Sequence, residues 1–311
     1  MVLTIGPYFY IKIRLQKLRK NNIKLEQLIT ERSAEIMAQK DELEVQHGLM
    51  KYQQNEILDS IQYARRIQSA VLVPFKNIMT VSKEFFIFFK PKDIVSGDFY
   101  WSTILNNKLI VAIGDCTGHG VPGAFMSMLG ISFLKQIVNE KKIHTPGKIL
   151  DLLRDMTISS LQQSDEDNEL YDGMDMTLCS YDLKTEILEF AGANNSLYLI
   201  RENEITKISG DRMPISSYPT MDPFTNKLVD ARKGDCLYMF SDGYIDQFGG
   251  PRGKKYKIKL FSEFLLEIHK KPMKEQKELL DQNLKDWISF KDKNGETFEQ
   301  VDDIVVLVVK L

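Results

Sequence analysis

Four aspartates in the sequence stand at the ends of apolar runs that are typical of buried strands. They are Asp98 in SGDFYW, Asp115 in AIGDCTGHG, Asp242 in FSDGY and Asp302 in EQVDDIVVLVV. A strand can hold a carboxylate rigidly at its end, and the glycines beside the first three let the backbone and an ion come close. Carboxylates that lie side by side need a counter-charge, and no cluster of Arg or Lys accompanies these motifs. We therefore expect a hard divalent cation, Mg²⁺ or Mn²⁺, and two such ions can share one carboxylate and one water.

Taken one at a time, these aspartates are weak signals. An Asp-Gly pair is most often a turn, and an Asp ahead of a helix is most often a cap. The information lies in the order, because GD, GDCTGHG, SDG and DD follow one another along one chain. The ordered set favours a metal-dependent site over four unrelated turns.

The segments that must position these aspartates are strands and helices of an α+β domain. Short β-rich runs begin at Phe85, and they are interrupted by helical stretches at 124–140 and 146–163, with a later helix expected at about 259–289. Adjacent strands joined by short turns pair antiparallel, and helices grouped apart from the strands cover the sheets. We predict a layered α-β-β-α sandwich of antiparallel sheets over 75–311. The expected strands are 85–90, 108–116, 176–183, 186–193, 196–201, 235–243 and 303–311.

Residues 12–73 form a different kind of segment, a long helical arm. It contains no proline, Gly48 is its only glycine, and Pro74 ends it. One heptad row from Leu15 to Val71 is apolar apart from one Asn, whereas the row three residues later is apolar only at its two ends. This pattern favours a dynamic parallel coiled-coil dimer that serves as a signalling linker. A solvated single helix and packing onto the body of the protein are the alternatives.

Residues 1–11 are apolar, and a basic cluster from Lys12 to Lys20 follows them. The apolar run is shorter than the roughly 20 residues that cross a bilayer as a helix. Apolar residues followed by positive ones resemble the cytoplasmic end of a membrane segment. We expect a cytoplasmic protein tethered to the inner face of the membrane through a segment that precedes or includes 1–11. The alternative is the frayed start of an amphipathic helix.

Composition narrows the function classes. The chain has 311 residues and a net charge of -2, which gives no reason to expect nucleic acid as a partner. Its three cysteines, Cys116, Cys179 and Cys236, are far apart and form no CxxC pair. Neither a zinc site nor a disulfide framework is indicated, and a reducing compartment is the default.

The ordered motifs resemble the metal-dependent protein phosphatases of the PPM type, most closely the bacterial branch typified by stage II sporulation protein E. The resemblance covers 75–311, and the arm resembles linkers that join such phosphatases to upstream sensor modules. It implies a metal-dependent phosphatase that acts on phosphoserine or phosphothreonine. The matching segments are PKDIVSGDFYW (91–101), GDCTGHGVPGAFMSMLG (114–130), FSDGYID (240–246) and VDDIVVLVV (301–309).

The resemblance implies a ligand set for two Mn²⁺ or Mg²⁺ ions. Asp115 matches the ligand that bridges both ions, and Cys116 matches a ligand through its backbone carbonyl. Asp242 and Asp302 match the other ligands of the first ion. Asp98 matches the acidic group that serves the second ion.

A third ion is implied only by some members of the family. Asp172 and Asp246 match its ligands, Asp175 could take the place of Asp172, and solvated turn residues are the alternative account. Asp303 is expected to be a hydrogen-bonding neighbour rather than a ligand. Ser96 stands where the family commonly has a second glycine, which bears on the geometry of the turn before the second ion's aspartate.

The implied reaction is attack on phosphorus by a water held between the two ions, without a phosphoenzyme intermediate. His119 could protonate the leaving oxygen, or only shape the turn before the next helix. Lys92 could touch the substrate phosphate, or be a solvated lysine. A thiol mechanism through Cys116 is disfavoured, because the loop GDCTGHGVPG has no arginine to close a phosphate cradle.

The family branch implies a substrate class, a small phosphorylated regulatory protein of a bacterial signalling pathway. Two other interpretations stay open: a catalytically silent dimeric scaffold, and a metal-dependent hydrolase of small phosphoesters. Retention of all four acidic positions favours catalysis over the scaffold. The two helices after the GHG turn are expected to act as a switch that the arm biases, with a simple tether as the alternative.

Overall fold

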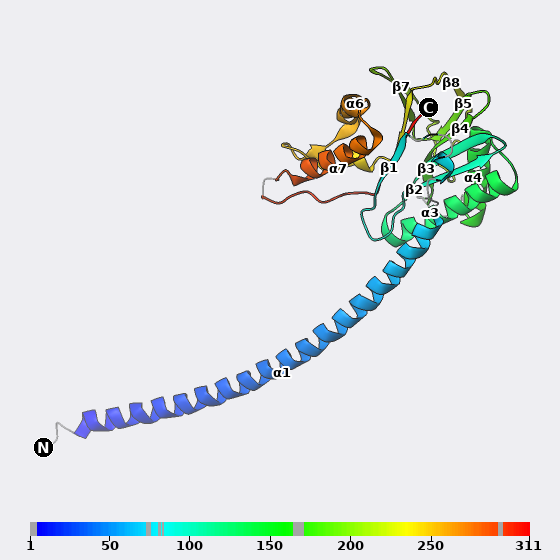
Figure 1. Cartoon of the computed structure of the whole chain (residues 1–311). Helices are drawn as coiled ribbons and strands as arrows, with labels where there is room; N and C mark the ends of the chain where they lie inside the picture. The colour runs from blue at the N-terminus through cyan, green and yellow to red at the C-terminus, as the bar shows by residue number, and fades with distance from the viewer. Residues whose placement is uncertain (1–4, 73–75, 80–81, 83, 164–170, 292–294) are drawn as a thin grey trace. The chain divides into compact units, whose positions relative to one another are not determined.

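The computed structural model describes residues 5–72, 76–79, 82, 84–163, 171–291 and 295–311. The chain divides into two compact units, Met1–Ser60 and Ile61–Leu311. Helix α1 (Ile5–Val71) is 67 residues long, and its last turns belong to the second unit (Figure 1). The long N-terminal helix predicted from the sequence is therefore confirmed. Every described side chain from Tyr8 to Ser60 is exposed.

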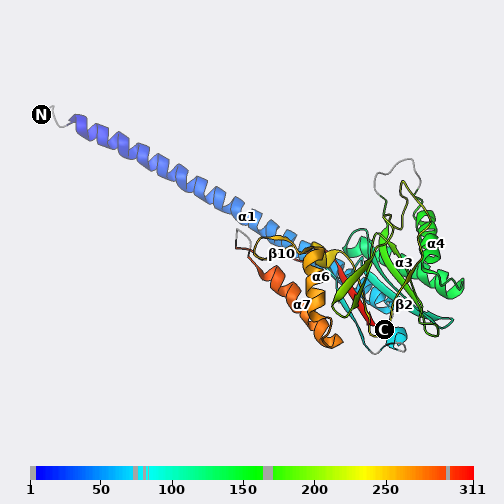
Figure 2. The ribbon, with the colours of Figure 1, turned by 90° about the horizontal axis from the view of Figure 1, so that it is seen from above.

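The second unit contains two antiparallel five-stranded sheets (Figures 1 and 2). The first sheet has the order β1 (Phe85–Lys90), β12 (Ile304–Lys310), β9 (Cys236–Phe240), β6 (Leu197–Arg201) and β7 (Glu204–Ile208). The second has the order β2 (Phe99–Leu105), β3 (Lys108–Cys116), β4 (Met174–Asp182), β5 (Leu188–Ala193) and β8 (Lys227–Val229).

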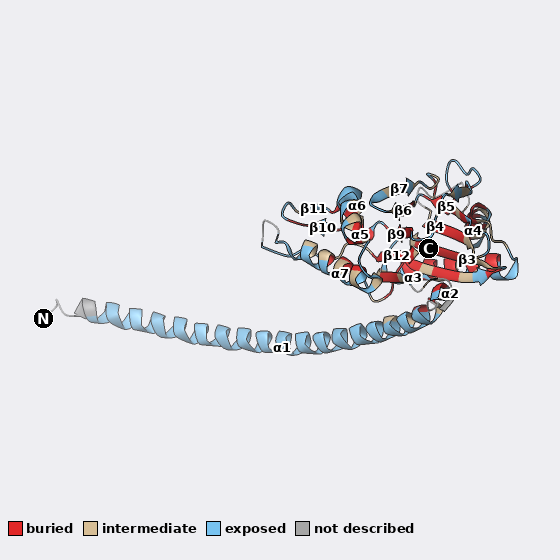
Figure 3. Ribbon diagram, turned by 45° about the horizontal axis from the view of Figure 1, so that its top comes forward, coloured by how far each residue is buried: buried red, intermediate tan, exposed pale blue. Residues whose placement is uncertain are grey.

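Helices cover the outer face of each sheet. Helix α3 (Gly120–Leu134), its π-helical continuation η1 (Lys135–Glu140) and α4 (Pro146–Ser160) pack on the second sheet, whereas α6 (Lys257–Ile268) and α7 (Met273–Ser289) pack on the first. This arrangement confirms the predicted α-β-β-α sandwich, and Figure 3 shows its buried layers. The short elements are α2 (Lys76–Met79), α5 (Gly243–Asp246), β10 (Phe248–Gly249) and β11 (Lys254–Lys255).

Strand β12 contributes side chains to two of the three apolar layers of the sandwich. Ile304, Val306 and Val308 pack in the layer under α6 and α7, whereas Val305 and Leu307 pack between the two sheets. Alternate side chains of a strand point to opposite faces, so a strand that is covered on both faces needs an unbroken apolar sequence. The run IVVLVV supplies it, and it anchors the strand end that follows the DD motif.

Two sequence expectations need correction. The single helix expected at about 259–289 is two helices, because Pro272 stands at the N-cap of α7 and a proline cannot donate the hydrogen bond that would continue α6. Strands β2, β7, β8, β10 and β11 were not among the expected strands. Strands β7 and β8 carry partly exposed side chains at sheet edges, and β10 and β11 have only two residues each.

One helical stretch among the described residues, Gly120–Glu140, is long and apolar enough to cross a membrane by length and composition. Half of it is buried within the protein, and Leu134, Ile137 and Val138 lie in the hydrophobic core beneath the second sheet's helices. Burial of this kind is typical of a core helix. The first four residues of the predicted 1–11 anchor lie outside the described part of the chain.

Candidate active site

Strands β2 and β3 bring two of the predicted aspartates to one end of the second sheet. Asp98 directly precedes β2, and Asp115 is the penultimate residue of β3. The antiparallel register pairs Phe99 with Gly114. Because the start of one strand lies beside the end of its antiparallel neighbour, Asp98 and Asp115 are neighbours at this end.

Strands β9 and β12 bring the other two predicted aspartates to one end of the first sheet. Asp242 follows the end of β9, and Asp302 precedes the start of β12. The backbone nitrogen of Asp242 lies 3.5 Å from Oδ2 of Asp115, so the acidic ends of the two sheets meet.

A pocket of about 320 Å³ lies at this meeting point. Asp115, Asp242 and Asp302 line it together with Asp175, while Asp98 is buried and only 3% exposed. The structure thus brings three of the four predicted aspartates into one pocket, with the fourth against them. The other lining residues are Cys116, Thr117, Gly118, Tyr171, Gly173, Met174, Pro214 and Ser216.

The carboxylates lie close enough to oppose one another's ionisation. Burial is the largest cause that raises the pKa of Asp98 well above its usual value, and a hydrogen bond from Ser241 works against it. The charges of three further carboxylates add to the rise: Asp303, Asp302 and Asp242. Asp98 therefore resists ionisation unless a positive charge joins it.

Asp115 and Asp242 behave in the same way. Burial again comes first in raising the pKa of Asp115, followed by the charges of Asp98, Asp242, Asp175 and Asp302. The pKa of Asp242 is raised by burial and then by Asp246 and Asp302, and Lys255 opposes the rise. The Lys255 amine is itself held 2.6 Å from Asp246.

These residues fit a hard divalent cation. The pocket offers carboxylate and backbone oxygens, which Mg²⁺ and Mn²⁺ prefer, and it carries a surplus of negative charge that a cation would offset. In the described part of the chain no three His, Cys, Asp or Glu side chains already converge as a compact metal centre. The carboxylates instead stand around the pocket on four separate strand ends.

The turn that carries Asp98 is held by hydrogen bonds at successive residues. Asp303 accepts from the backbone nitrogen of Lys92 through Oδ1 at 2.8 Å and from that of Gly97 through Oδ2 at 2.7 Å. The Ser241 hydroxyl donates to Oδ2 of Asp98 at 2.6 Å. Asp303 therefore has the predicted role of a hydrogen-bonding neighbour, and Ser241 orients the Asp98 carboxylate.

Cys116 does not have the properties of a nucleophile. Its side chain is buried, and burial, followed by the charge of Asp115, raises the pKa of the thiol well above its usual value. Its carbonyl oxygen lies 3.4 Å from the position that a Cβ on Gly97 would take, so it faces the Asp98 turn. The ligand role of this carbonyl stays a prediction.

The residues proposed for a third ion are separated. Asp175 lies directly opposite Asp115 in the β3–β4 register and lines the pocket. Burial raises its pKa to about 6, against a 2.8 Å hydrogen bond from Asn194. Asp172 is exposed and is not among the lining residues, and Asp246 pairs with Lys255. Asp175 is thus better placed than Asp172, and the third ion stays a prediction.

His119 and Lys92 lie together, away from the lining of the acidic pocket. His119 Nδ1 is 2.6 Å from Oδ2 of Asp93, and its Nε2 is 3.0 Å from the Lys92 amine. His119 occupies the N-cap position of α3 but makes no capping hydrogen bond with its side chain. Lys92 and Asp93 line a neighbouring pocket of about 640 Å³ with Arg65 and Val121. The role of His119 as proton donor and the role of Lys92 in substrate binding stay predictions.

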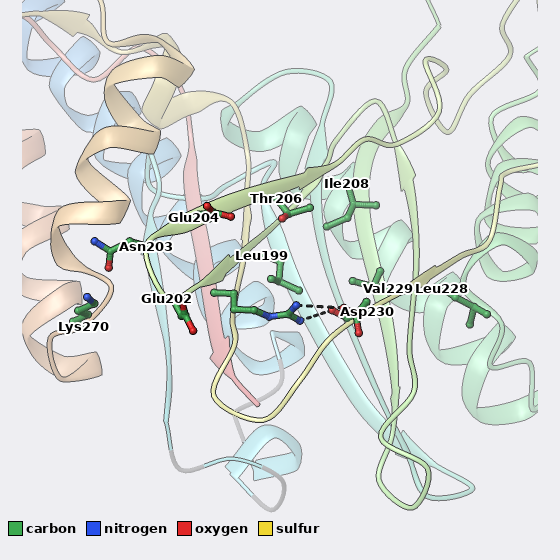
Figure 4. A pocket seen from close by; sticks show the side chains of 11 residues that line it. Leu199, Glu202, Asn203, Glu204, Thr206, Ile208, Leu228, Val229, Asp230 and Lys270 are labelled. Carbon is green, nitrogen blue, oxygen red and sulfur yellow. Dashed lines mark hydrogen bonds and ion pairs between the residues drawn. The ribbon is translucent and has the colours of Figure 1, made fainter.

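Another cavity, of about 970 Å³, shares no lining residue with the acidic pocket. It lies among β6, β7 and β8 (Figure 4), and the Arg201 guanidinium donates a hydrogen bond to Asp230 there. Arg201 also pairs with the buried Asp235 at 2.8 Å. The charge of Arg201 is therefore compensated within the protein, and the volume of this cavity alone does not make it the reactive site.

Comparison with known proteins agrees with the geometry. A family model described as Stage II sporulation protein E matches residues 106–311. The SiaA-PP2C domain of Pseudomonas aeruginosa is 31% identical, with 83% of this chain and 98% of that chain covered and a TM-score of 0.73. No curated protein matches the sequence significantly.

Two further structures are similar in fold alone. The PP2C phosphatase domain and regulatory fragment of SpoIIE from Bacillus subtilis is 20% identical, covering 73% of this chain and 61% of that chain, with a TM-score of 0.57. The RsbU and RsbW domains of a Mycobacterium tuberculosis protein are 17% identical, with coverages of 74% and 60% and a TM-score of 0.56.

The sandwich with an acidic pocket at the strand ends is that of a PPM-type serine/threonine phosphatase. Within that class, the chain belongs to the stage II sporulation protein E family.

Sequence reasoning missed two residues of the site. Ser241 was visible only as part of the SDG motif, and nothing in the sequence linked it to Asp98, 143 residues away. Gln68, in the last turns of α1, is 4% exposed and bonds the turn that carries Asp98. Its signal was a polar residue among apolar ones at helical spacing, Ile61, Ala64 and Val71.

Proposed function

We propose that this protein is a divalent-metal-dependent phosphatase that removes phosphate from phosphoserine or phosphothreonine of a bacterial regulatory protein. The observation that carries the proposal is the acidic pocket with Asp98 against it, where the charges of Asp242 and Asp302 add to burial in raising the pKa of both Asp98 and Asp115. Among the described residues, the only cation near these groups, Lys255, is held by Asp246. Two Mn²⁺ or Mg²⁺ ions would supply a counter-charge.

The residues around the pocket would have two kinds of role, to hold the ions and to orient the residues that hold them. Asp115, Asp242 and Asp302 would hold the ions from the strand ends, and Asp98 would complete the second site. Ser241 fixes the direction of the Asp98 carboxylate, and Asp303 fixes the turn that bears it. When bound, the ions would lower the pKa of the attacking water and offset charge on the phosphoryl group.

The substrate class is proposed from the family and from the shape of the site. Tyr171, Pro214 and Ser216 line the pocket beside the acidic residues, and we propose that a phosphorylated side chain of a protein enters next to them. A phosphorylated regulator as the substrate is proposed from the resemblance to this family branch.

Phosphate release from a phosphoserine peptide tests this proposal, with a nucleotide as the comparison substrate. Release with Mn²⁺, no release with EDTA, and preference for the peptide are expected. A preference for the nucleotide would favour a small-phosphoester hydrolase instead. No release, together with normal Mn²⁺ binding, would favour the silent scaffold.

We also propose self-association through α1. Its apolar heptad row is exposed throughout the first unit, with Ile36 64%, Leu43 66% and Met50 67% exposed. Exposed apolar seams of this length are typical of helix–helix contacts. Sedimentation of the full chain should show a dimer that Ile36→Lys weakens and that Gln39→Lys, in the polar row, does not. A monomeric wild type would contradict the proposal.

Arm-dependent regulation is a further expectation of this proposal. Removal of residues 1–60 would delete the first unit and leave the last turns of α1 with the second. If the arm biases the helices after the GHG turn, this truncation changes kcat several-fold, on the scale of typical allosteric coupling. Unchanged kinetics would leave the arm as a tether to an upstream sensor module.

We propose a cytoplasmic protein that is held at the inner face of the membrane through a segment that precedes or includes 1–11. The apolar start and the basic residues after it support this placement. Fractionation should recover the full chain with membranes, and full solubility without detergent would contradict a tether.

A further inference from the structure

The short hairpin of β10 and β11 holds the backbone of Lys255 in place. The two strands pair antiparallel, and their register sets Lys255 opposite Phe248. The next residue, Tyr256, is 5% exposed, and its backbone nitrogen donates to the carbonyl oxygen of Gln247 at 2.9 Å. The Lys255 amine lies 6.0 Å from the centre of the Phe248 ring, within the range of a cation–π contact. The lysine is thus fixed by the hairpin and by the residue that follows it.

The same packing joins the hairpin to one of the predicted metal ligands, Asp242. Helix α5 directly follows Asp242 and ends at Asp246, whose backbone nitrogen donates to the Asp242 carbonyl oxygen at 2.9 Å. Tyr244 of this helix is fully buried and packs edge-on against Tyr256, with 5.4 Å between the ring centres. Asp246 is therefore carried on a one-turn helix that is packed against the base of the hairpin.

The positive charge of Lys255 acts on two carboxylates. Its amine donates to Oδ2 of Asp246 at 2.6 Å. That hydrogen bond, followed by the charges of Asp246 and Asp242, raises the pKa of the amine. The charge of Lys255 also acts on Asp242, where it opposes the repulsion that comes from Asp246. One lysine thus offsets negative charge both at Asp246 and at the neighbouring metal ligand.

The carboxylates that match a third ion have other surroundings in this structure. Asp175 accepts a 2.8 Å hydrogen bond from the amide of Asn194. Asp172 is exposed and does not line the acidic pocket. Asp246 is held by Lys255, so a divalent ion there would meet a positive charge at close range, which is unfavourable. The residues present therefore do not fit a third ion.

We propose that Lys255 is a built-in cation that takes the place of a third divalent ion beside Asp242. The inference rests on the proposed metal-dependent function. The lysine offsets the charge of Asp246 at every Mn²⁺ concentration and leaves the four strand-end aspartates to two ions. It acts through carboxylates and not on the substrate, so it is a positioning residue. Loss of its charge should open Asp246 to a further ion and strengthen the binding of cations at Asp242.

The test compares Lys255→Met with Lys254→Met in the full chain. Methionine keeps much of the length of the lysine side chain but carries no charge. Lys254 is an exposed lysine on the same strand, and successive side chains of a strand project to opposite sides. Calorimetry on EDTA-stripped protein gives the number of Mn²⁺ ions bound and their affinity, and circular dichroism confirms that each variant is folded.

We expect wild type and Lys254→Met to bind two Mn²⁺ ions per chain and Lys255→Met to bind a third. The first two should bind about threefold more tightly in Lys255→Met, on the scale of one partly exposed charge. This direction separates the proposal from a merely structural role, because a disturbed hairpin would weaken binding. Three ions in wild type, weakened or unchanged binding in Lys255→Met, or an equal gain in Lys254→Met would each overturn the proposal.

A second variant keeps the inference testable if Lys255→Met does not fold. Asp246→Asn leaves the lysine without its carboxylate, so its charge acts uncompensated beside Asp242. We expect two bound Mn²⁺ ions that bind about threefold more weakly than in wild type. Unchanged or tighter binding in this variant would overturn the proposal. A folded wild-type chain that binds no Mn²⁺ would overturn the proposed function as well, whereas two ions in wild type with unaffected variants would remove only the role of Lys255.

Discussion

The acidic pocket and the cluster formed by His119, Asp93 and Lys92, here called the His119 cluster, lie in the same domain. They differ in how far their charges are balanced within the protein. At the acidic pocket, the charges of the buried Asp98, the exposed Asp242 and the half-buried Asp302 all act on Asp115, and the nearby Lys255 is already held by Asp246. In the His119 cluster, Asp93 and Lys92 bind the two ring nitrogens, and the His119 and Asp93 side chains are 47% and 46% exposed. The second cluster balances its own charge in contact with water.

This difference shows which of the two clusters requires a bound cation. Exposed, paired charges interact weakly and need no further partner. Carboxylates that crowd together with little positive charge near them resist ionisation until a cation joins them. The acidic pocket is therefore the place where metal ions, and the chemistry they supply, are expected, and the His119 cluster is a secondary feature of its surroundings.

The largest effect is expected from Asp115→Asn. Asp115 stands where the two sheets meet and faces the other carboxylates, so its loss removes the charge that both ions would share. We expect phosphate release to fall more than a hundredfold, since changes to supporting residues alone cost about 10–100-fold. Release from a phosphoserine peptide with Mn²⁺ measures it, and near-normal release would contradict the central place of this residue.

A smaller loss is expected from Ser241→Ala. The hydroxyl is buried and donates to Asp98 at 2.6 Å, so the variant frees the carboxylate to turn. The Mn²⁺ requirement should rise about tenfold, and excess Mn²⁺ should restore most of the rate. A fall in rate that no Mn²⁺ concentration restores would place Ser241 in the reaction itself.

A still smaller effect is expected from His119→Ala. Its side chain is half exposed and bonded at both nitrogens, which favours a role in the turn before α3 over proton transfer. We expect kcat to fall less than about tenfold, because a general acid would contribute about 10²–10⁴. A hundredfold loss together with a changed pH profile would instead support the predicted role of proton donor to the leaving oxygen.

The smallest effect concerns pH and Asp175. Burial raises its pKa from 3.8 to about 6 in the folded protein, so the protonated carboxyl stabilises the fold below pH 3.8 and this contribution is lost as pH rises through 6. In EDTA at pH 7.5, Asp175→Asn should melt roughly 2–4 °C higher than wild type. Near pH 4 the two should melt together. A lower melting temperature of the variant at pH 7.5 would show that the ionised carboxylate is stabilised there.

Much of the site could be predicted because its residues follow local rules. Asp98, Asp115, Asp242 and Asp302 were visible as carboxylates at the ends of apolar runs, and the ends of neighbouring strands meet at one end of a sheet. The α-β-β-α layers followed from strand runs and grouped helices.

The remainder depended on information that no local pattern carries. The register of β3 and β4 places Asp175 opposite Asp115, and a sequence cannot show a register directly. Gln68 and Ser241 act across 28 and 143 residues of chain. The break between α6 and α7 was readable at Pro272, but the apolar periodicity on both sides suggested one helix.

The central claim is that the acidic pocket binds divalent metal ions. Calorimetric titration of the EDTA-stripped full chain with Mn²⁺ tests it most directly. The uncompensated carboxylates predict at least two ions bound for each wild-type chain, and a loss of that binding in Asp115→Asn. Absence of Mn²⁺ and Mg²⁺ binding to the folded wild-type protein, or equal binding in Asp115→Asn, would contradict it.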